Sequence, residues 1–231
     1  MSVSIVIPHY NHWEFTHALL ADLFKHEVDN INEVILVDNG GTDEEIFRGE
    51  KFWKQQFQIK DCNFRILTLR ENVGFLLAAN LGLQEARSTV KILISNDVRV
   101  KGKFVEQVRD LILSGYTRKL VGQKLYVTDT GWNTFDNQVY PYLEGFFLAT
   151  MTDGWDELGY FDVDFIPADY EDVALSTKAR KLGYELVPLN LPFIDHVGAG
   201  TYGYNAERLR ITEANREKFR QKYHESMSDL P

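Results

Sequence analysis

Four short polar segments, each directly after an apolar run, carry residue types that could bind a ligand or do chemistry. They are Pro8-His9-Tyr10-Asn11, Asp38-Asn39-Gly40-Gly41-Thr42-Asp43, Arg70-Glu71-Asn72-Val73-Gly74 and Ser95-Asn96-Asp97. In an open parallel sheet, ligands bind in the crevice outside the carboxyl ends of the strands. If the apolar runs are strands of such a sheet, these segments place carboxylates and amides where a nucleotide would lie.

Each of these segments also has a purely structural interpretation. Asp38-Asn39-Gly40-Gly41 is typical of a turn, with Thr42 or Asp43 as the N-cap of a following helix. Asn72 suits a loop that leads into a helix, and Asp97 suits a surface position. Independent turns need not place such residues after successive apolar runs, so the set as a whole favours a binding site.

A cluster of acidic residues occurs in the second half of the chain, at Asp169-Tyr170-Glu171-Asp172. Its structural interpretation is a helix N-cap with acidic first-turn residues, since the helix dipole favours negative charge there. Its catalytic interpretation is a general base, which must be ionised without being too acidic to accept a proton. Like-charged neighbours raise the pKa of a carboxyl group, so this cluster provides the environment that a base requires.

Histidines and glycines give three further signals. His196 follows the apolar run 189–194, where a hydrogen-bonded structural histidine is the alternative to a ligand. Gly198-Ala199-Gly200-Thr201-Tyr202-Gly203 matches the G-x-G-x-x-G pattern outside any strand–helix–strand unit, and we interpret it as a flexible, lid-like segment. Of the early histidines only His9 and His12 are closely spaced, and they lack acidic or thiol partners nearby, so a zinc site is not indicated.

The composition bounds the class of protein. The chain has 231 residues, of which 44% are hydrophobic and 26% charged, as in ordinary globular domains. Its single cysteine, Cys62, excludes an internal disulfide, and we expect a cytoplasmic protein, or one peripheral to a membrane. No apolar stretch reaches the roughly 18 to 20 residues of a membrane-spanning helix. A net charge of −9 disfavours nucleic acid as a partner.

Apolar runs of strand length alternate with segments of helical spacing in the first half of the chain. The runs predict strands at Val3–Ile7, Val34–Val37, Phe64–Leu69 and Val90–Ile94. The segments that follow them predict helices at Trp13–His26, Glu44–Phe57, Gly74–Ala86 and Phe104–Leu113. This alternation predicts an α/β fold with a mostly parallel central sheet flanked by helices.

The pattern changes after about Leu120. Aromatic and glycine-punctuated segments such as Tyr140–Met151 predict a smaller mixed or antiparallel part and indicate a wall on which a sugar could stack. A helix follows at Glu171–Leu182 and ends at Gly183.

The last segment, Asn205–Glu225, predicts an amphipathic helix with Leu209, Ile211 and Phe219 against the body and its charges in solvent. We expect one domain over residues 1–231. Its nucleotide-binding half extends to about residue 120, its acceptor and catalytic half covers about 121–204, and its C-terminal helix covers about 205–226.

The order of these motifs resembles that of the family 2 glycosyltransferases, which have the Rossmann-like GT-A fold. The segments that carry the resemblance are Ser4-Ile5-Val6-Ile7-Pro8-His9-Tyr10-Asn11, 34–43, 70–80, Ser95-Asn96-Asp97-Val98, 144–148, 159–162, 170–175, 181–184 and His196. Together they run from about residue 3 to residue 201, and it is the ordered set that is specific.

The resemblance implies an inverting enzyme that uses a nucleotide-sugar donor, with UDP as the favoured nucleotide. It implies a donor site formed by Pro8, Asn11, Asp38, Asn72, Gly74, Asn96 and Asp97. It further implies that Asp97 and His196 hold a divalent metal on the donor phosphates, Mn²⁺ in preference to Mg²⁺. Asp172 would be the general base, with Glu171 as its neighbour, and the acceptor would be a glycan, a lipid-linked sugar or a protein.

Two residues depart from the family pattern. Ser95 stands where the fuller metal motif has a first Asp, and Ala174 stands where many relatives carry another acid. The first departure motivates an alternative, a catalytically silent module that binds a nucleotide sugar or a carbohydrate. A sugar nucleotidyltransferase is a third hypothesis, but it would need a glycine-rich basic loop after the first strand, and Pro8-His9-Tyr10-Asn11-His12 is no such loop.

Overall fold

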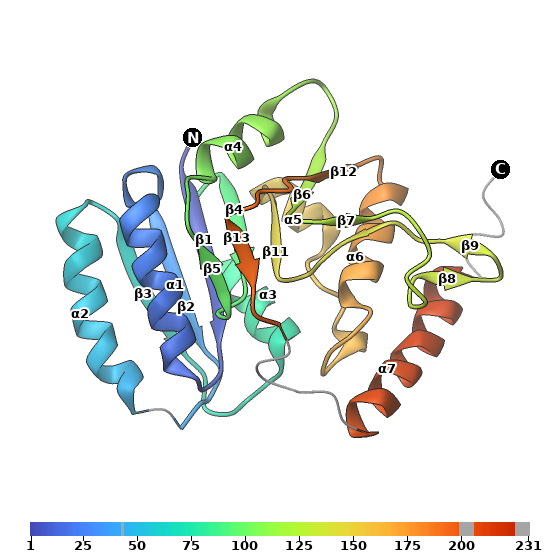
Figure 1. Cartoon of the computed structure of the whole chain (residues 1–231), viewed down its shortest axis with the longest axis horizontal. Coiled ribbons are helices and arrows are strands. Elements are labelled where there is room, and N and C mark those ends of the chain that lie inside the picture. The colour runs from blue at the N-terminus through green and yellow to red at the C-terminus, as the bar shows by residue number, and fades with distance from the viewer. Residues whose placement is uncertain (43, 199–205, 225–231) are drawn as a thin grey trace.

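A seven-stranded sheet forms the centre of the molecule, seen in a computed structural model that describes residues 1–42, 44–198 and 206–224 (Figure 1). Its strands are, in spatial order, β12 (Glu185–Pro188), β6 (Lys119–Gly122), β11 (Phe147–Met151), β4 (Val90–Ile94), β1 (Val3–His9), β2 (Glu33–Asp38) and β3 (Asn63–Thr68). β4, β1, β2 and β3 are mutually parallel, whereas β11 is antiparallel to both of its neighbours. The predicted α/β fold with a mostly parallel sheet is confirmed.

Helices cover both faces of this sheet. They are α1 (Trp13–His26), α2 (Glu45–Ile59), α3 (Phe75–Glu85), α4 (Val105–Leu113), α5 (Thr152–Leu158), α6 (Glu171–Lys181) and α7 (Ala206–Phe219), with short 3₁₀ turns at Val28–Asn30 and Val163–Phe165. α1, α2 and α4 contribute to the core on one face, and α3, α5, α6 and α7 to the core on the other. Within the described residues, no helix is both long enough and apolar enough to span a bilayer.

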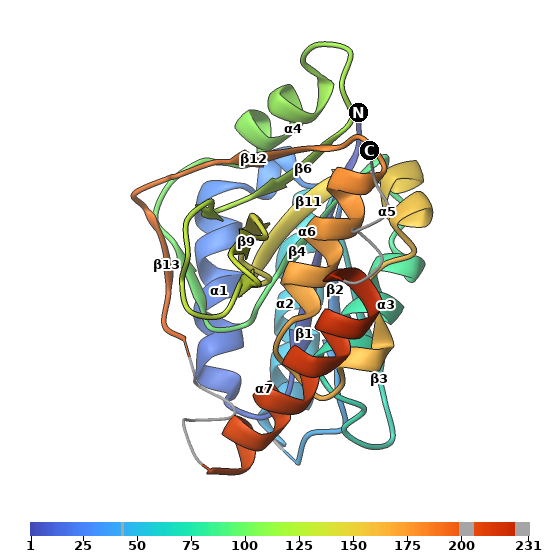
Figure 2. The same cartoon turned by 90° about the vertical axis from the view of Figure 1, so that its right-hand side faces the viewer.

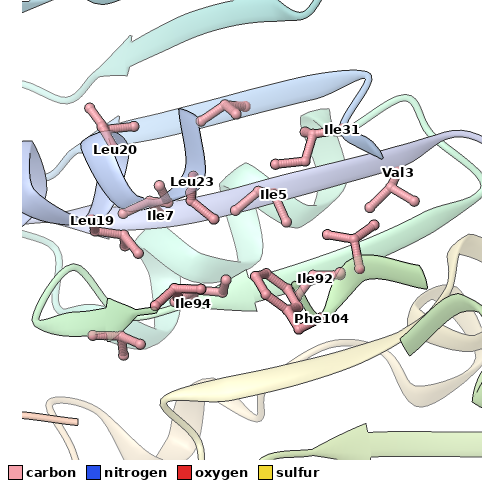
Figure 3. Packing of buried hydrophobic residues seen from close by; sticks show 14 of the residues in the cluster. Val3, Ile5, Ile7, Leu19, Leu20, Leu23, Ile31, Ile92, Ile94 and Phe104 are labelled. Carbon is pink, nitrogen blue, oxygen red and sulfur yellow. The ribbon is translucent and has the colours of Figure 1, made fainter. Parts of the chain in front are cut away.

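The alternation of side chains along β1 explains why the sheet needs two cores. Ile5 and Ile7 are fully buried on the face toward α1, and Val6 between them is fully buried on the opposite face. Figure 3 shows Ile5 and Ile7 packed close to Leu19 and Leu23 of α1. Fully burying an aliphatic side chain contributes about 1.5–3 kcal/mol, so this strand is a major source of stability.

Strands of the second half extend the first sheet instead of forming a separate part. β11 inserts between β4 and β6, with Ala149 opposite Ile92 and Val121. Three two-stranded sheets complete the structure: β5 (Val98–Val100) with β13 (Ile194–His196), β7 (Leu125–Tyr126) with β10 (Tyr142–Leu143), and β8 (Thr134–Phe135) with β9 (Gln138–Val139). The smaller mixed part that we predicted is therefore continuous with the parallel half.

The C-terminal helix is present, and of the three residues predicted to face the body Phe219 is buried, Ile211 is half-buried and Leu209 is exposed. α7 lies beside α6 in both views, and a π-helical turn at Arg220–His224 follows it (Figures 1 and 2). Leu209 is 55% exposed, whereas Thr212, Asn215 and Phe219 are buried. The helix therefore packs through two polar residues and one aromatic, because the surface that it covers offers backbone carbonyls, as described below.

The surroundings of Gly82 show how closely α3 packs on the sheet. A Cβ atom at this position would lie 2.4 Å from Val6 Cγ1 and 2.8 Å from Val37 Cγ2. Alanine normally stabilises a helix by about 1 kcal/mol relative to glycine. We expect Gly82→Ala to do the opposite and destabilise the protein by about 1–3 kcal/mol through overpacking, lowering Tm in thermal unfolding by about 2–4 °C per kcal/mol.

The matched control is Gln84→Ala, two residues further along α3 on its exposed side. Its effect should stay within about 0.5 kcal/mol. An unchanged or raised Tm for Gly82→Ala would contradict the close approach of α3 to β1 and β2.

Candidate active site

The loops after β1 and β2 are joined by side-chain hydrogen bonds. Asn11 Oδ1 accepts from Thr42 N at 2.9 Å, and Asp38 Oδ1 accepts from Gly41 N at 3.3 Å. A Cβ atom at Gly41 would lie 2.9 Å from Asn11 Oδ1, so the two loops are in contact. The structure therefore brings Asn11 and Asp38 to one end of the sheet, where Pro8, buried in β1, pairs in register with Val37 of β2.

Asn39 links the loops after β2 and β3, a role that the sequence alone did not reveal. Its Oδ1 accepts from Val73 N and its Nδ2 donates to Asn72 Oδ1, both at 2.9 Å. Asn72 Oδ1 also accepts from Gly74 N at 2.9 Å. The sequence predicts a turn or a binding segment at Asn39 but not these hydrogen bonds, because they depend on tertiary contact between two loops.

Gly40 allows these loops to approach. Its φ is +69°, in the left-handed region that favours glycine, and a Cβ atom here would lie 2.3 Å from the carbonyl carbon of Glu71. The three loops after β1, β2 and β3 thus form one packed cluster that contains Asn11, Asp38 and Asn72.

The early histidines have partners of different kinds. His9 is buried with its Nδ1 2.7 Å from Thr16 Oγ1, and the same hydroxyl accepts from Asn96 Nδ2 at 3.2 Å. His12 Nδ1 lies 3.1 Å from Glu14 Oε1, so the expectation that this histidine lacks an acidic partner is wrong. His17 Nδ1 accepts from Trp53 Nε1 at 3.3 Å. Asn96 therefore directs its amide toward the His9–Thr16 pair.

Asp97 and His196 lie together although they are far apart in the sequence. β5 and β13 pair antiparallel with His196 opposite Val98, and Val197 N donates to the carbonyl of Asp97 at 3.1 Å. His196 Nε2 is 3.2 Å from Asp97 Oδ1. The His196 ring stacks on Phe146, with ring centroids 4.2 Å apart.

These two side chains form a donor set that fits a divalent cation. Carboxylate oxygen and neutral imidazole nitrogen are both ligands of Mn²⁺, which also accepts phosphate oxygens and water. The Asp97 and His196 side chains are 12% and 31% exposed, so a ligand from solvent can reach the pair. The pair supplies two ligands and no third: nowhere in the described ranges is a group of three or more His, Cys, Asp or Glu residues placed to hold a metal.

The acidic cluster begins α6, as predicted. Asp172 Oδ2 accepts from Gly145 N at 3.2 Å, and its Oδ1 accepts from Val173 N at 2.8 Å. Glu171 Oε2 is buried and has no hydrogen-bond partner among the described residues. The two preceding residues, Asp169 and Tyr170, have φ values of +70° and +73°, an uncommon conformation outside glycine that is found at strained functional sites.

Burial raises the pKa of both carboxyls of the Glu171–Asp172 pair. For Asp172, burial is the largest cause; the negative charges of Glu144 and Asp169 add to it, and the bonds from Val173 N and Gly145 N oppose it. For Glu171, burial again comes first and the charge of Asp172 second. The sequence predicted the contribution of neighbouring charges, but burial, which depends on tertiary packing, is larger.

Residues of α7 hold the segment that leads into this pair. Arg208 donates to both carboxylate oxygens of Asp169, at 2.8 and 3.3 Å, and Thr212 also donates to that carboxylate. Asn215 Nδ2 lies 2.8, 2.7 and 3.1 Å from the carbonyl oxygens of Phe165, Ala168 and Asp169. We predicted that the charges of this helix face solvent; for Arg208 that is wrong.

A pocket of about 350 Å³ opens beside Asp172. Its lining combines aromatic rings, carboxylates and one arginine: Trp132, Tyr142, Glu144, Asp169, Tyr170, Asp172, Val173, Arg208, Leu209 and Thr212. The predicted sugar-stacking wall, Tyr140–Met151, contributes Tyr142 and Glu144 to it. Of the lid-like segment only Gly198 belongs to the described residues; 199–203 lie outside them, as does Asp43.

Comparison with known protein sequences gives two kinds of match. The chain is 28% identical to the uncharacterized protein Rv1525 of Mycobacterium tuberculosis over 221 residues, which cover 87% of this chain and 76% of that protein. It is 30% identical over 104 residues to the glycosyltransferase GlyG of Streptococcus pneumoniae, covering 45% of this chain and 33% of that protein.

Comparison with solved structures gives the same fold. The mannosyltransferase PcManGT of Pyrobaculum calidifontis, in complex with GDP-Man and Mn²⁺, matches with a TM-score of 0.68 and 19% identity over 99% of this chain. TarS 1-349 of S. aureus, in complex with UDP-GlcNAc, matches with a TM-score of 0.65 and 16% identity over 100% of this chain. The chain spans 65% of the PcManGT chain and 68% of the TarS chain.

A sequence model of glycosyl transferase family 2 matches residues 4–166, which is more than half of the chain. This range includes the loops after β1 to β4, with Asp97, and Gly145, which donates to Asp172. The chain belongs to glycosyl transferase family 2 and is a glycosyltransferase with the GT-A fold.

Proposed function

We propose that this chain transfers a sugar from a nucleoside-diphosphate sugar, with UDP as the favoured nucleotide, to an acceptor hydroxyl with inversion of the anomeric carbon. One observation carries the proposal: the segment before β11 touches both candidate reactive centres. Gly145 N donates to Asp172 Oδ2, and the ring of Phe146 stacks on His196, which pairs with Asp97. A metal-bound diphosphate and a general base would therefore both lie beside the same two-residue segment, Gly145-Phe146.

The donor would bind across the packed loops at the strand ends. We assign Pro8, Asn11, Asp38, Asn72 and Gly74 to the base and ribose, and Asn96 and Asp97 to the diphosphate side. Asn11 and Asp38 accept from backbone N–H groups of the loop after β2, and Asn72 accepts from the Asn39 amide. These hydrogen bonds would fix the groups before the donor arrives, which reduces the entropy lost on binding.

Asp97 and His196 would hold the divalent metal, with Mn²⁺ favoured and Mg²⁺ as the alternative. When bound, the cation would stabilise the negative charge that develops on the leaving diphosphate. Ser95 leaves this chain with one carboxylate in the motif, so we expect the donor phosphates to supply further ligands and the affinity for metal alone to be low.

Asp172 would take the proton from the attacking hydroxyl. Its raised pKa favours this role, because a base is most effective when its pKa approaches the working pH. Glu171 would assist because its nearby carboxyl disfavours the state in which both members of the pair are ionised. One base and one leaving group define a single displacement, and hence inversion. The acceptor would be a glycan, a lipid-linked sugar or a protein.

The donor assignment predicts a metal-dependent thermal shift. UDP, GDP and dTDP are compared with the monophosphate CMP as a control. We expect one of the three diphosphates to raise Tm only when Mn²⁺ is present, because the metal would be bound by the protein and the diphosphate together. Asp97→Asn should abolish the Mn²⁺-dependent part. Asp195→Asn is the matched control, since Asp195 precedes His196 in β13 but pairs with Lys101 at 2.6 Å. The assignment would be contradicted if none of the nucleotides raised Tm, or if Asp97→Asn and Asp195→Asn lost the Mn²⁺-dependent shift equally.

The base assignment predicts that Asp172→Asn lowers kcat for sugar transfer and for donor hydrolysis by about 10²–10⁴-fold while the donor-induced Tm shift survives. The matched control is Asp153→Asn. Asp153 is likewise the second residue of a helix, α5, and its Oδ1 likewise accepts from the next backbone N–H, that of Gly154 at 2.9 Å. Turnover of Asp172→Asn equal to that of Asp153→Asn would show that Asp172 is not the base.

A further inference from the structure

The pocket beside Asp172 has a composition that selects one class of acceptor. Building on the proposed function, we infer that the acceptor is an uncharged sugar whose ring packs on Trp132, and that acceptors bearing phosphate or carboxylate groups at the reacting sugar are rejected. The inference depends on the free ring of Trp132, on the arrangement of the carboxylates, and on the one arginine of the lining.

Trp132 presents an unused aromatic face. Its side chain is 49% exposed, and the indole makes no ring contact and no hydrogen bond with any other described residue. Tryptophan buries about 150–250 Å² when covered, so an unpaired ring beside a reactive carboxylate offers a large binding area. A sugar ring has a face of C–H groups that matches such a surface, with its hydroxyls directed to the edge.

The position of Trp132 is fixed by its backbone. Tyr170, which directly precedes the Glu171–Asp172 pair, donates its hydroxyl to the carbonyl oxygen of Trp132 at 2.8 Å. The adjacent Asn133 is fully buried; its Oδ1 accepts from Thr130 N at 2.9 Å and its Nδ2 donates to the carbonyl of Tyr140 at 3.1 Å. The loop therefore holds the backbone of Trp132 in place before any ligand binds, which limits the positions that the indole can take and lowers the entropic cost of binding.

The polar part of the pocket suits hydroxyl groups. Glu144, Asp169 and Asp172 all line it, and an ionised carboxylate can only accept hydrogen bonds. Tyr126 fixes Glu144 by donating its hydroxyl to Oε1 at 2.8 Å, and the Tyr126 ring stacks on Tyr142. Sugar hydroxyls are donors, so they match this set, and one of them would be placed at Asp172 for deprotonation.

Among the residues that the structure describes in the pocket lining, none offers an available cation to an anionic acceptor. Arg208 is the one cation that the described residues contribute to the lining, and its guanidinium already bonds both oxygens of Asp169. Lys124 lies nearby but over the Tyr126 ring, at 4.4 Å from its centroid, and is not part of the lining. A phosphate would therefore face carboxylates without a counter-charge, an arrangement that opposes binding.

The test compares neutral and anionic acceptors that share one sugar ring. With the donor and Mn²⁺ present, p-nitrophenyl glycosides of glucose, galactose, mannose and N-acetylglucosamine are offered beside their 6-phosphates and a glucuronide. We expect release of nucleoside diphosphate above the hydrolysis background with at least one neutral glycoside, and less than a tenth of that increase with its charged counterpart. Stimulation by charged acceptors alone, or by no neutral glycoside, would overturn the inference.

Variants identify the residues responsible. Trp132→Ala should raise KM for the neutral acceptor about tenfold or more and change kcat much less, and Trp132→Phe should restore most of the affinity. Phe52→Ala is the matched control, because Phe52 is also 49% exposed but lies on α2. An unchanged KM in Trp132→Ala, or an equal change in Phe52→Ala, would overturn the role of Trp132.

A second variant tests the charge. Glu144→Gln keeps an oxygen that can accept the hydrogen bond from the Tyr126 hydroxyl but removes one negative charge. It should therefore lower the ratio of kcat/KM for neutral over phosphorylated sugar acceptors about tenfold. No narrowing would contradict the electrostatic part of the inference. Absence of donor hydrolysis in the wild-type protein would instead count against the proposed function, which keeps the two failures distinct.

Discussion

The hydrogen bond from Gly145 N to Asp172 Oδ2 joins the two parts of the molecule on which activity would depend. Gly145 precedes β11, which lies in the middle of the main sheet beside β4, and Ser95 at the end of β4 donates its N–H to the carbonyl of Phe146 at 2.8 Å. A Cβ atom at Gly145 would lie 3.3 Å from Asp172 Cβ, so the approach of α6 is close. The sheet thereby sets the separation between the strand-end loops and the acidic helix α6. The side chains on each part are then oriented by contacts within that part.

That arrangement carries a cost in stability. Carboxyls with a raised folded-state pKa favour folding most at low pH, and this contribution is lost as the pH rises through the folded pKa, because each ionised group is then less stable inside than in the unfolded chain. The surrounding structure offsets the cost: Arg208 and Asn215 of α7 hold the preceding segment, and the two cores supply the bulk of the folding free energy. Ionisable groups held in unfavourable surroundings are typical of functional sites.

The sequence predicted the local elements well and the non-local ones poorly. Trp13–His26 and Val90–Ile94 have the predicted bounds, because strong periodicity and flanking turn residues define them. The insertion of β11 between β4 and β6 depends on pairing between distant segments, and no local pattern encodes it. The same limit applies to the site, where Asn39 resembles an ordinary turn residue. On α7 the hydrophobic pattern identified the buried Phe219 correctly, but it pointed to Leu209 where the polar residues Thr212 and Asn215 are buried instead.

The pH dependence of kcat for donor hydrolysis, measured with saturating donor and Mn²⁺, tests the central claim that the partly buried Glu171–Asp172 pair acts as the base. Protonation of a base with a raised pKa removes activity at a higher pH, so the acid limb should lie well above the ordinary aspartate value of 3.8. Glu144→Gln should move this limb to lower pH, because it removes a negative charge that raises the pKa of Asp172. An acid limb at the ordinary value, unmoved by Glu144→Gln, would contradict the account.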